Sequence, residues 1–110
     1  MATTANWNSM KRSVSRGGVD RRVFSGEKCM MVLNELQPGS KPNLHHHPHE
    51  QLCYIVGGTC RFVLGDEILD LAGGDVVLIP PDVPHSLEVT SSVPVLNMDV
   101  FSPIREDFLS

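Results

Sequence analysis

The sequence has no long apolar run, and this absence argues against a membrane-spanning chain. Among the 110 residues, no segment approaches the ~20 consecutive apolar residues that a transmembrane helix needs. Basic residues are also in the minority, with nine Lys and Arg against thirteen Asp and Glu, so the formal net charge is -4. Surfaces that bind nucleic acid are normally basic. We therefore expect neither a membrane nor a nucleic acid as partner.

Cysteine is scarce, and its pattern is unlike that of a disulfide-stabilised domain. Cys29, Cys53 and Cys60 are odd in number and show no CxxC spacing. Small secreted domains held by disulfides usually have an even number of cysteines at higher density. Residues 1–13 are polar and lack the apolar stretch of a secretory signal. We therefore expect reduced thiols and a cytoplasmic location.

Sustained helical periodicity is also missing, except for a weak indication in the last few residues. Short apolar or alternating runs are separated instead by Gly and Pro. The expected strands lie at residues 23–24, 27–36, 52–56, 59–64, 67–71, 76–79, 86–90 and 93–101. Many short strands at this spacing are typical of a β-sandwich or β-barrel. The length allows a single core, so we expect one all-β domain over residues 21–110, including a C-terminal tail.

Residues 1–20 are expected to form an N-terminal arm ahead of this domain. Ser, Thr, Asn and Gly dominate the arm, and Trp7 is its one large aromatic side chain. Two interpretations remain open. The arm is either a disordered, solvated tail or a strand exchanged with a second subunit, with Trp7 as its apolar anchor.

The most informative stretch is residues 39–58, GSKPNLHHHPHEQLCYIVGG, in which four histidines and a glutamine precede an apolar strand. Residues two apart in an extended chain share a face, so His45 and His47 point one way and His46 the other. Neutral imidazole is the commonest metal ligand in proteins. If Gln51 continues the face of His45 and His47, its amide oxygen is a third ligand. The pattern therefore predicts a metal site.

A site built on one short hairpin needs a ligand from elsewhere, and the remaining histidine is His85. It follows a second strand-like run, residues 76–79, and a turn stiffened by three prolines. The alternatives for the histidine cluster are a purification tag and a solvated loop. The cluster is internal and interrupted by Pro48, which argues against a tag, and His85 supplies the distant partner that a solvated loop would not need.

These two stretches resemble the two motifs of the cupin family. Gly39, His45, His47, Gln51 and Gly58 match the spacing of the first motif, with Gln where most cupins have Glu. Gly74, Pro80 and His85 match the second motif, although Asp82 replaces the usual Gly and Val89 the usual Asn. The resemblance covers roughly residues 22–101. It implies a cupin β-barrel of the double-stranded β-helix (jelly-roll) type around one metal ion.

The last strand contains a carboxylate, Asp99, that shares a face with Asn97 and Phe101. Burying a carboxylate is costly unless it has a partner. One interpretation is a structural ion pair between Asp99 and Arg105. The other follows from residues 99–109, DVFSPIREDFL, which resemble the C-terminal signature of cupins that open unsaturated uronate rings in pectin and alginate breakdown. That resemblance implies that Asp99, Phe101 and Arg105 are active-site residues and that the ligand set is His, His, Gln, His.

The expected function is therefore a metal-dependent, non-redox conversion of 4,5-unsaturated monouronates to linear keto sugar acids. The metal is one divalent transition ion, and zinc, nickel, manganese and iron all remain open because a nitrogen-rich site accepts several. Two alternatives also remain: a cupin dioxygenase acting on a small molecule, and a non-catalytic module that binds or senses a small acid. In each case the partner is a small anionic molecule such as a sugar acid. The apolar strands, and the resemblance to cupins, favour a homodimer.

Overall fold

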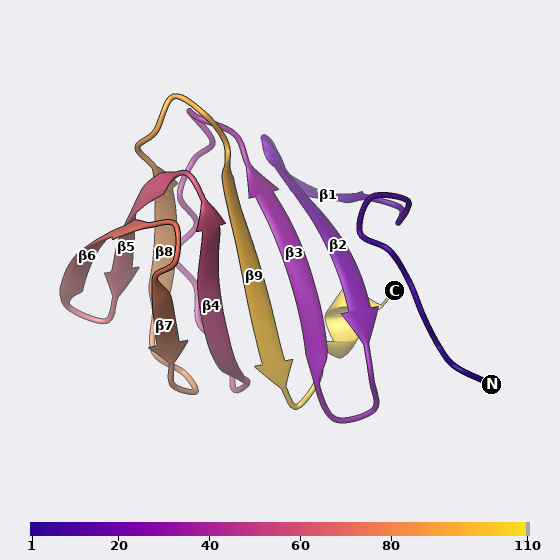
Figure 1. The fold of residues 1–110 in the computed structure, drawn as a ribbon. Helices are drawn as coiled ribbons and strands as arrows, with labels where there is room; N and C mark the ends of the chain where they lie inside the picture. Colours follow the sequence, from indigo (N-terminus) through magenta and orange to yellow (C-terminus); the bar gives the residue numbers. More distant parts are fainter. Residues whose placement is uncertain (110) are drawn as a thin grey trace.

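The regular secondary structure is almost entirely β-strand in the computed structural model, which describes residues 1–109 (Figure 1). The strands are β1 (Ser13–Arg16), β2 (Val19–Ser25), β3 (Met30–Leu36), β4 (Glu50–Gly57), β5 (Thr59–Leu64), β6 (Glu67–Ala72), β7 (Val76–Ile79), β8 (His85–Val89) and β9 (Val95–Ser102). A 3-10 helix, η1 (Glu106–Phe108), follows β9. None of the described residues forms a helix long and apolar enough to cross a membrane.

The strands form two antiparallel sheets. The larger has the order β1-β2-β3-β9-β4-β7, and the smaller has the order β6-β5-β8. Sequence-distant strands are neighbours in the larger sheet, because β9 lies between β3 and β4 (Figure 1). This arrangement confirms the predicted all-β jelly roll, with one difference: the two sheets do not close into a continuous barrel.

Alternation of side chains explains why these segments are strands and where the core lies. Along β4 and β9, every second residue is buried, and the intervening ones are exposed or half-buried. The main core cluster joins inward-facing side chains of both sheets, among them Cys53, Ile55, Phe62 and Ile79. A second cluster, Met30, Val32 and Phe101, extends beneath the C-terminal segment. Period-two patterning thus separates an apolar interior from an outer face.

The N-terminal segment contributes two strands to the larger sheet. The expected boundary at residue 20 falls inside β2, and β1 pairs antiparallel with β2 of the same chain. Strand β2 in turn pairs with β3 along its whole length. Residues 13–20 therefore form one end of the sheet whose inner face holds the functional side chains.

Candidate metal centre and substrate cavity

Two sequence-distant segments meet through a short antiparallel bridge between His45 and His85. The amide of His45 donates to the carbonyl of His85 at 3.1 Å, and the amide of His85 donates back at 2.9 Å. A third bond, from the Asp82 amide to the carbonyl of His47, is 2.8 Å long. These backbone bonds fix the first histidine segment against the turn that precedes β8.

Asp82 lies at a special backbone position in that turn. Its φ is +65°, in the left-handed region that favours glycine. This explains why glycine is usual at the corresponding motif position and why aspartate, which tolerates this region better than most residues, can replace it. The substitution therefore leaves the turn, and the placement of His85, intact.

The bridge brings together the three histidines that the sequence singled out. The ligand atoms of His45, His47 and His85 all lie within 4.8 Å of one another, a grouping that could hold a metal ion. His47 and His85 are buried, with exposed fractions of 7% and 3%. His46 points away, its side chain 64% exposed, as the alternation predicted.

Backbone carbonyls determine which ring nitrogen of each histidine is available. Nδ1 of His45 lies 2.7 Å from the carbonyl oxygen of Asn43, Nδ1 of His47 3.1 Å from that of His49, and Nδ1 of His85 2.9 Å from that of Val83. Because a carbonyl oxygen only accepts hydrogen bonds, Nδ1 of His45 and Nδ1 of His85 carry the proton and donate it, whereas both ring nitrogens of His47 face an oxygen acceptor. In the neutral rings, Nε2 of His45 and Nε2 of His85 therefore present lone pairs, the form that binds a metal, and Nε2 of His47 does so in the tautomer that holds its proton on Nδ1.

Burial favours the neutral, ligating form of these rings. It lowers the pKa of His85 to about 4, and it is also the main cause of the lowered pKa of His47. The remaining contributions to lowering these pKa values come from the neighbouring histidines and Arg105. At neutral pH, the buried imidazoles are therefore uncharged and able to act as ligands.

Two further observations indicate that this set of donor atoms fits a cation. Nε2 of His85 is buried and has no hydrogen-bond partner among the described residues. Oε1 of Gln51 lies 2.9 Å from Nε2 of His47, and with the ring proton on Nδ1 this contact places two lone-pair atoms against each other. Such a contact is unfavourable without a positive charge shared between them. Three imidazole nitrogens and one amide oxygen thus fit a divalent transition metal.

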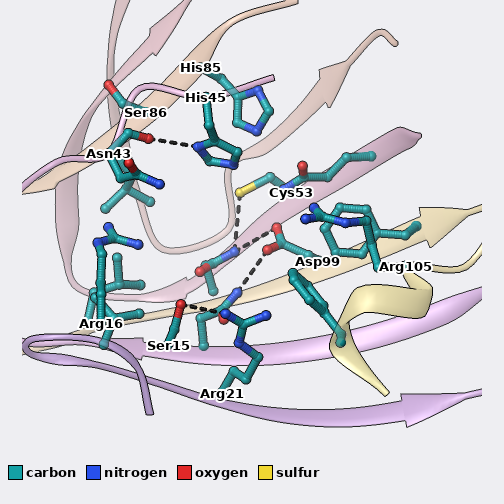
Figure 2. A pocket seen from close by; sticks show the side chains of 18 of the residues that line it. Ser15, Arg16, Arg21, Asn43, His45, Cys53, His85, Ser86, Asp99 and Arg105 are labelled. Atoms are coloured by element: carbon teal, nitrogen blue, oxygen red, sulfur yellow. Dashed lines mark hydrogen bonds between the residues drawn. The ribbon is translucent and has the colours of Figure 1, made fainter. Parts of the chain in front are cut away.

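Asp99 is buried in the cavity next to this group (Figure 2). Its Oδ2 accepts a hydrogen bond from Nδ2 of Asn34, and its Oδ1 accepts one from Nδ2 of Asn97, both 2.8 Å long. Burial raises the pKa of Asp99 to about 6, although hydrogen bonding from Gln51 and the other polar neighbours opposes the rise. A carboxyl group with a pKa near neutrality can both take up and release a proton.

Arg105 and Phe101 also line the cavity, but Arg105 does not pair with Asp99. Its Nε and Nη2 donate to the two carboxylate oxygens of Asp107, at 3.1 and 2.9 Å. The Asp99–Arg105 ion pair that the sequence left open is therefore not formed. Phe101 packs edge-on against the ring of His47, with 5.5 Å between centroids, and so forms a wall beside the histidines.

The cavity, about 180 Å³ in volume, has lining residues that the sequence did not single out. Asn34 and Asn97 hold Asp99, while Arg16 and Arg21 enter from β1 and β2. One signal was available: Asn34 interrupts the apolar run Met30–Leu36 on the face of the buried Val32. The arginines gave no such signal, because their inward orientation depends on how β1 and β2 join the sheet.

Comparison with known proteins agrees with this architecture. Residues 32–101 match the family described as the cupin domain. An uncharacterised protein of Methanocaldococcus jannaschii, MJ1618, is 31% identical over 84 residues, which cover 76% of this chain and 67% of that protein. The oxalate decarboxylase OxdC of Bacillus subtilis is 29% identical over 85 residues, but these cover 68% of this chain and 22% of the enzyme.

Among solved structures, KdgF from Halomonas sp. superposes with a TM-score of 0.89. The match covers 98% of this chain and 99% of that one, at 24% sequence identity. Likeness at this level of identity shows that the two chains share a fold over nearly their whole lengths.

Proposed function

This chain belongs to the cupin family, and from that premise we propose that it is a metal-dependent enzyme that opens the ring of 4,5-unsaturated monouronates without net oxidation. The observation that carries the proposal is the position of Asp99, a carboxyl group with a pKa of about 6 in the cavity lined by His45, His85 and Gln51, beside the three-histidine group. The C-terminal resemblance to cupins that open unsaturated uronate rings supplies the substrate class.

His45, His47, Gln51 and His85 would hold the metal, and the identity of the ion among zinc, nickel, manganese and iron stays open. A bound divalent ion would supply a Lewis acid, and four neutral ligands would leave it with its full charge of +2. A glutamate at position 51 would reduce that charge by one. A neutral ligand set favours the binding of an anionic substrate over stabilisation of a higher oxidation state, so Gln51 supports non-redox chemistry.

The proposed reaction is an isomerisation in which no atoms are gained or lost. A proton leaves the anomeric hydroxyl group, the bond between C1 and the ring oxygen breaks, and C1 becomes an aldehyde. The enolate released at C4, C5 and the former ring oxygen then takes a proton at C4, and C5 becomes a ketone. In this scheme Asp99 accepts the first proton and returns it at C4, while Asn34 and Asn97 hold the carboxyl group by its two oxygens. Phe101 and Arg105 line the cavity beside the sugar.

The test measures loss of the ultraviolet absorbance of unsaturated galacturonate by the metal-loaded protein. We expect Asp99→Ala to lower the rate by roughly 10²–10⁴, the usual contribution of a general acid–base group. Metal content measured on the same samples separates loss of proton transfer from loss of the ion. If the Asp99→Ala protein retains its metal and clears the absorbance as fast as the parent, the proposed role is wrong.

Three rival functions predict different measurements on the same metal-loaded protein. Oxygen uptake with a small-molecule substrate would indicate a dioxygenase, and saturable binding of the sugar acid without turnover would indicate a binding or sensor module. Because a relative is named an oxalate decarboxylase, oxalate belongs in the substrate panel, and release of carbon dioxide from it would replace the present proposal.

We further propose a cytoplasmic homodimer. All three cysteines are free, which suits a reducing compartment. The outer face of the larger sheet presents an apolar patch formed by Leu52, Tyr54, Val76 and Leu78, each more than 40% exposed. These residues are cross-strand partners on β4 and β7, so the patch is continuous and contains no charged group. A second copy can cover such a patch through a two-fold axis without bringing the negative charges of two chains together at its centre.

A further inference from the structure

A substrate carboxylate needs a guanidinium group whose N–H donors are free to bind it. The donors of Arg105 that could bind a carboxylate in a bidentate way are already occupied by Asp107. Nε and Nη2 of Arg105 donate to both oxygens of Asp107, which is the bidentate geometry that a bound carboxylate would otherwise take. The Arg105 side chain is 13% exposed. A ligand carboxylate would therefore have to displace Asp107 before it could take this position.

Two other arginines line the same cavity without such a partner. Arg16 comes from β1 and Arg21 from β2, and both are half-buried. Within residues 1–109, the salt bridges of arginine involve Arg12, Arg61 and Arg105, and neither Arg16 nor Arg21 forms one. Their hydrogen-bond acceptors are neutral: Nη2 of Arg21 donates to Oγ of Ser15 at 2.6 Å, and Nε of Arg16 donates to the carbonyl of Lys41 at 3.3 Å.

Positive charge therefore accumulates in one cavity of a chain whose net charge is negative. Burial, followed by repulsion from Arg105, lowers the pKa of Arg21, and the charge of Asp107 partly offsets this lowering. Placing a half-buried guanidinium near other cations is unfavourable in the empty protein. An anion that enters the cavity would relieve this repulsion and bind more tightly as a result.

An aromatic ring and a hydroxyl group hold Arg21 in place. Its Cζ lies 3.9 Å from the centroid of the Phe108 ring, and Ser15 accepts a hydrogen bond from the same guanidinium group. Figure 2 shows Arg21 reaching into the cavity from β2, with Ser15 bonded to it. A guanidinium group that is fixed in this way loses little freedom when it binds a carboxylate, which favours affinity.

The register of the sheet places Arg21 close to the proton-transfer group. Arg21 pairs with Asn34 across β2 and β3, and Asn34 pairs with Asn97 across β3 and β9. Asp99 is two residues further along β9, about 6.8 Å in an extended strand. The side chain of Asn34 spans this gap by donating to Asp99. An anion on Arg21 would therefore lie beside Asp99, not at a remote end of the cavity.

We propose that Arg21, supported by Arg16, binds the carboxylate of the substrate, so that the N-terminal strands β1 and β2 complete the site. The assignment rests on the proposed function for the sugar acid itself. Under it, Arg105 is a positioning residue: its pair with Asp107 and its contacts with Phe101 and Phe108, whose ring centroids lie 5.2 and 4.2 Å from its Cζ, hold one wall of the cavity.

The experiment compares binding of galacturonate and galactose to the metal-loaded full chain by calorimetry. The two sugars differ only at C6, where one has a carboxylate and the other an uncharged hydroxymethyl group, so the ratio of their affinities reports the carboxylate contact. We expect the parent to prefer galacturonate about 10- to 100-fold, the range for a charge-assisted bond. Arg21→Gln should abolish the preference, and Arg21→Lys, which keeps the charge but loses the fork, should retain part of it.

Arg12→Gln is the matched control, because Arg12 lies in the same N-terminal segment but pairs with Asp20 and Glu35 and does not line the cavity. It should leave the preference unchanged, and thermal unfolding should show that each variant is folded. An unchanged preference in Arg21→Gln overturns the assignment. The assignment is also overturned if the parent does not distinguish the two sugars. It is overturned as well if the preference disappears in Arg105→Gln but persists in Arg21→Gln.

Failure of this inference is distinguishable from failure of the proposed function, because galacturonate is saturated and is not turned over. If the preference for galacturonate depends on Arg21 but the protein does not open unsaturated uronates, the anion site is supported and the proposed enzymatic function is wrong. If the protein turns over unsaturated uronates but its preference for galacturonate does not depend on Arg21, the proposed enzymatic function is supported and the proposed role of Arg21 is wrong.

Discussion

Nε2 of His47 lies 2.9 Å from Oε1 of Gln51, and Nδ1 of the same ring lies 3.1 Å from the carbonyl oxygen of His49, so a neutral ring, which carries one proton, cannot donate to both oxygens. The contact is therefore one that a metal ion would stabilise.

Substitution of two adjacent histidines, His46 and His47, should have different effects on metal binding. His47→Ala should weaken binding of a divalent metal by more than the ~10–100-fold typical of losing an outer-shell partner, because it removes a ligand. His46→Ala should bind like the parent, since His46 points outward. Elemental analysis and titration with Zn²⁺ measure the difference. A metal present at 100 times its dissociation constant should also stabilise the parent by about 2.7 kcal/mol, and equal loss of metal in both variants would contradict the site.

Two motif glycines with the same backbone conformation should differ in their tolerance of alanine. Gly39 and Gly58 both have φ of +83°, which costs an alanine about 1–2 kcal/mol. A Cβ on Gly39 would meet nothing within 4 Å, whereas one on Gly58 would lie 2.8 Å from the carbonyl oxygen of Pro94 and 2.9 Å from Cα of Val95. Gly58→Ala should therefore lose about 1–3 kcal/mol more than Gly39→Ala in chemical denaturation, and equal losses would be inconsistent with this close approach.

The three thiols should react very differently with iodoacetamide at pH 8. Cys29 is exposed, whereas Cys53 and Cys60 are each 1% exposed. Burial raises the pKa of Cys60 to about 11 and that of Cys53 well above its usual range, so at pH 8 only about one Cys60 thiol in a thousand is the reactive thiolate. Mass spectrometry should find one rapidly modified cysteine in the native protein and three after denaturation. Rapid native labelling of Cys60 would contradict the buried environment.

The apolar patch on the larger sheet should control oligomeric state. We expect a dimer by light scattering, and the double variant Leu52→Lys with Leu78→Lys should be a monomer, because it places charges at the centre of the patch. Ile68→Lys is the control: Ile68 is 68% exposed but lies on β6 of the smaller sheet. A parent that is monomeric, or a dimer disrupted only by Ile68→Lys, would contradict the proposed interface.

Much of the site could be predicted because its signals are local in the chain. The spacing His45-x-His47 puts two imidazoles on one face of an extended segment, and the same alternation along β4 and β9 turns Gln51 and Asp99 inward. The partner of Arg105 was not predictable in this way. Asp99 and Asp107 are both within a few residues of it, and the path of the chain into η1 determines that Asp107 receives the guanidinium group.

The sequence by itself determined the all-β class and the cupin motifs, because side-chain alternation and motif spacing are properties of short segments. Only the tertiary structure decided that the sheets stay open, that β9 lies between β3 and β4, and that Asn34 consequently reaches Asp99, with Arg21 opposite Asn34. The physical reason is that strand pairing depends on hydrogen bonds between residues far apart in the chain, which no local pattern specifies.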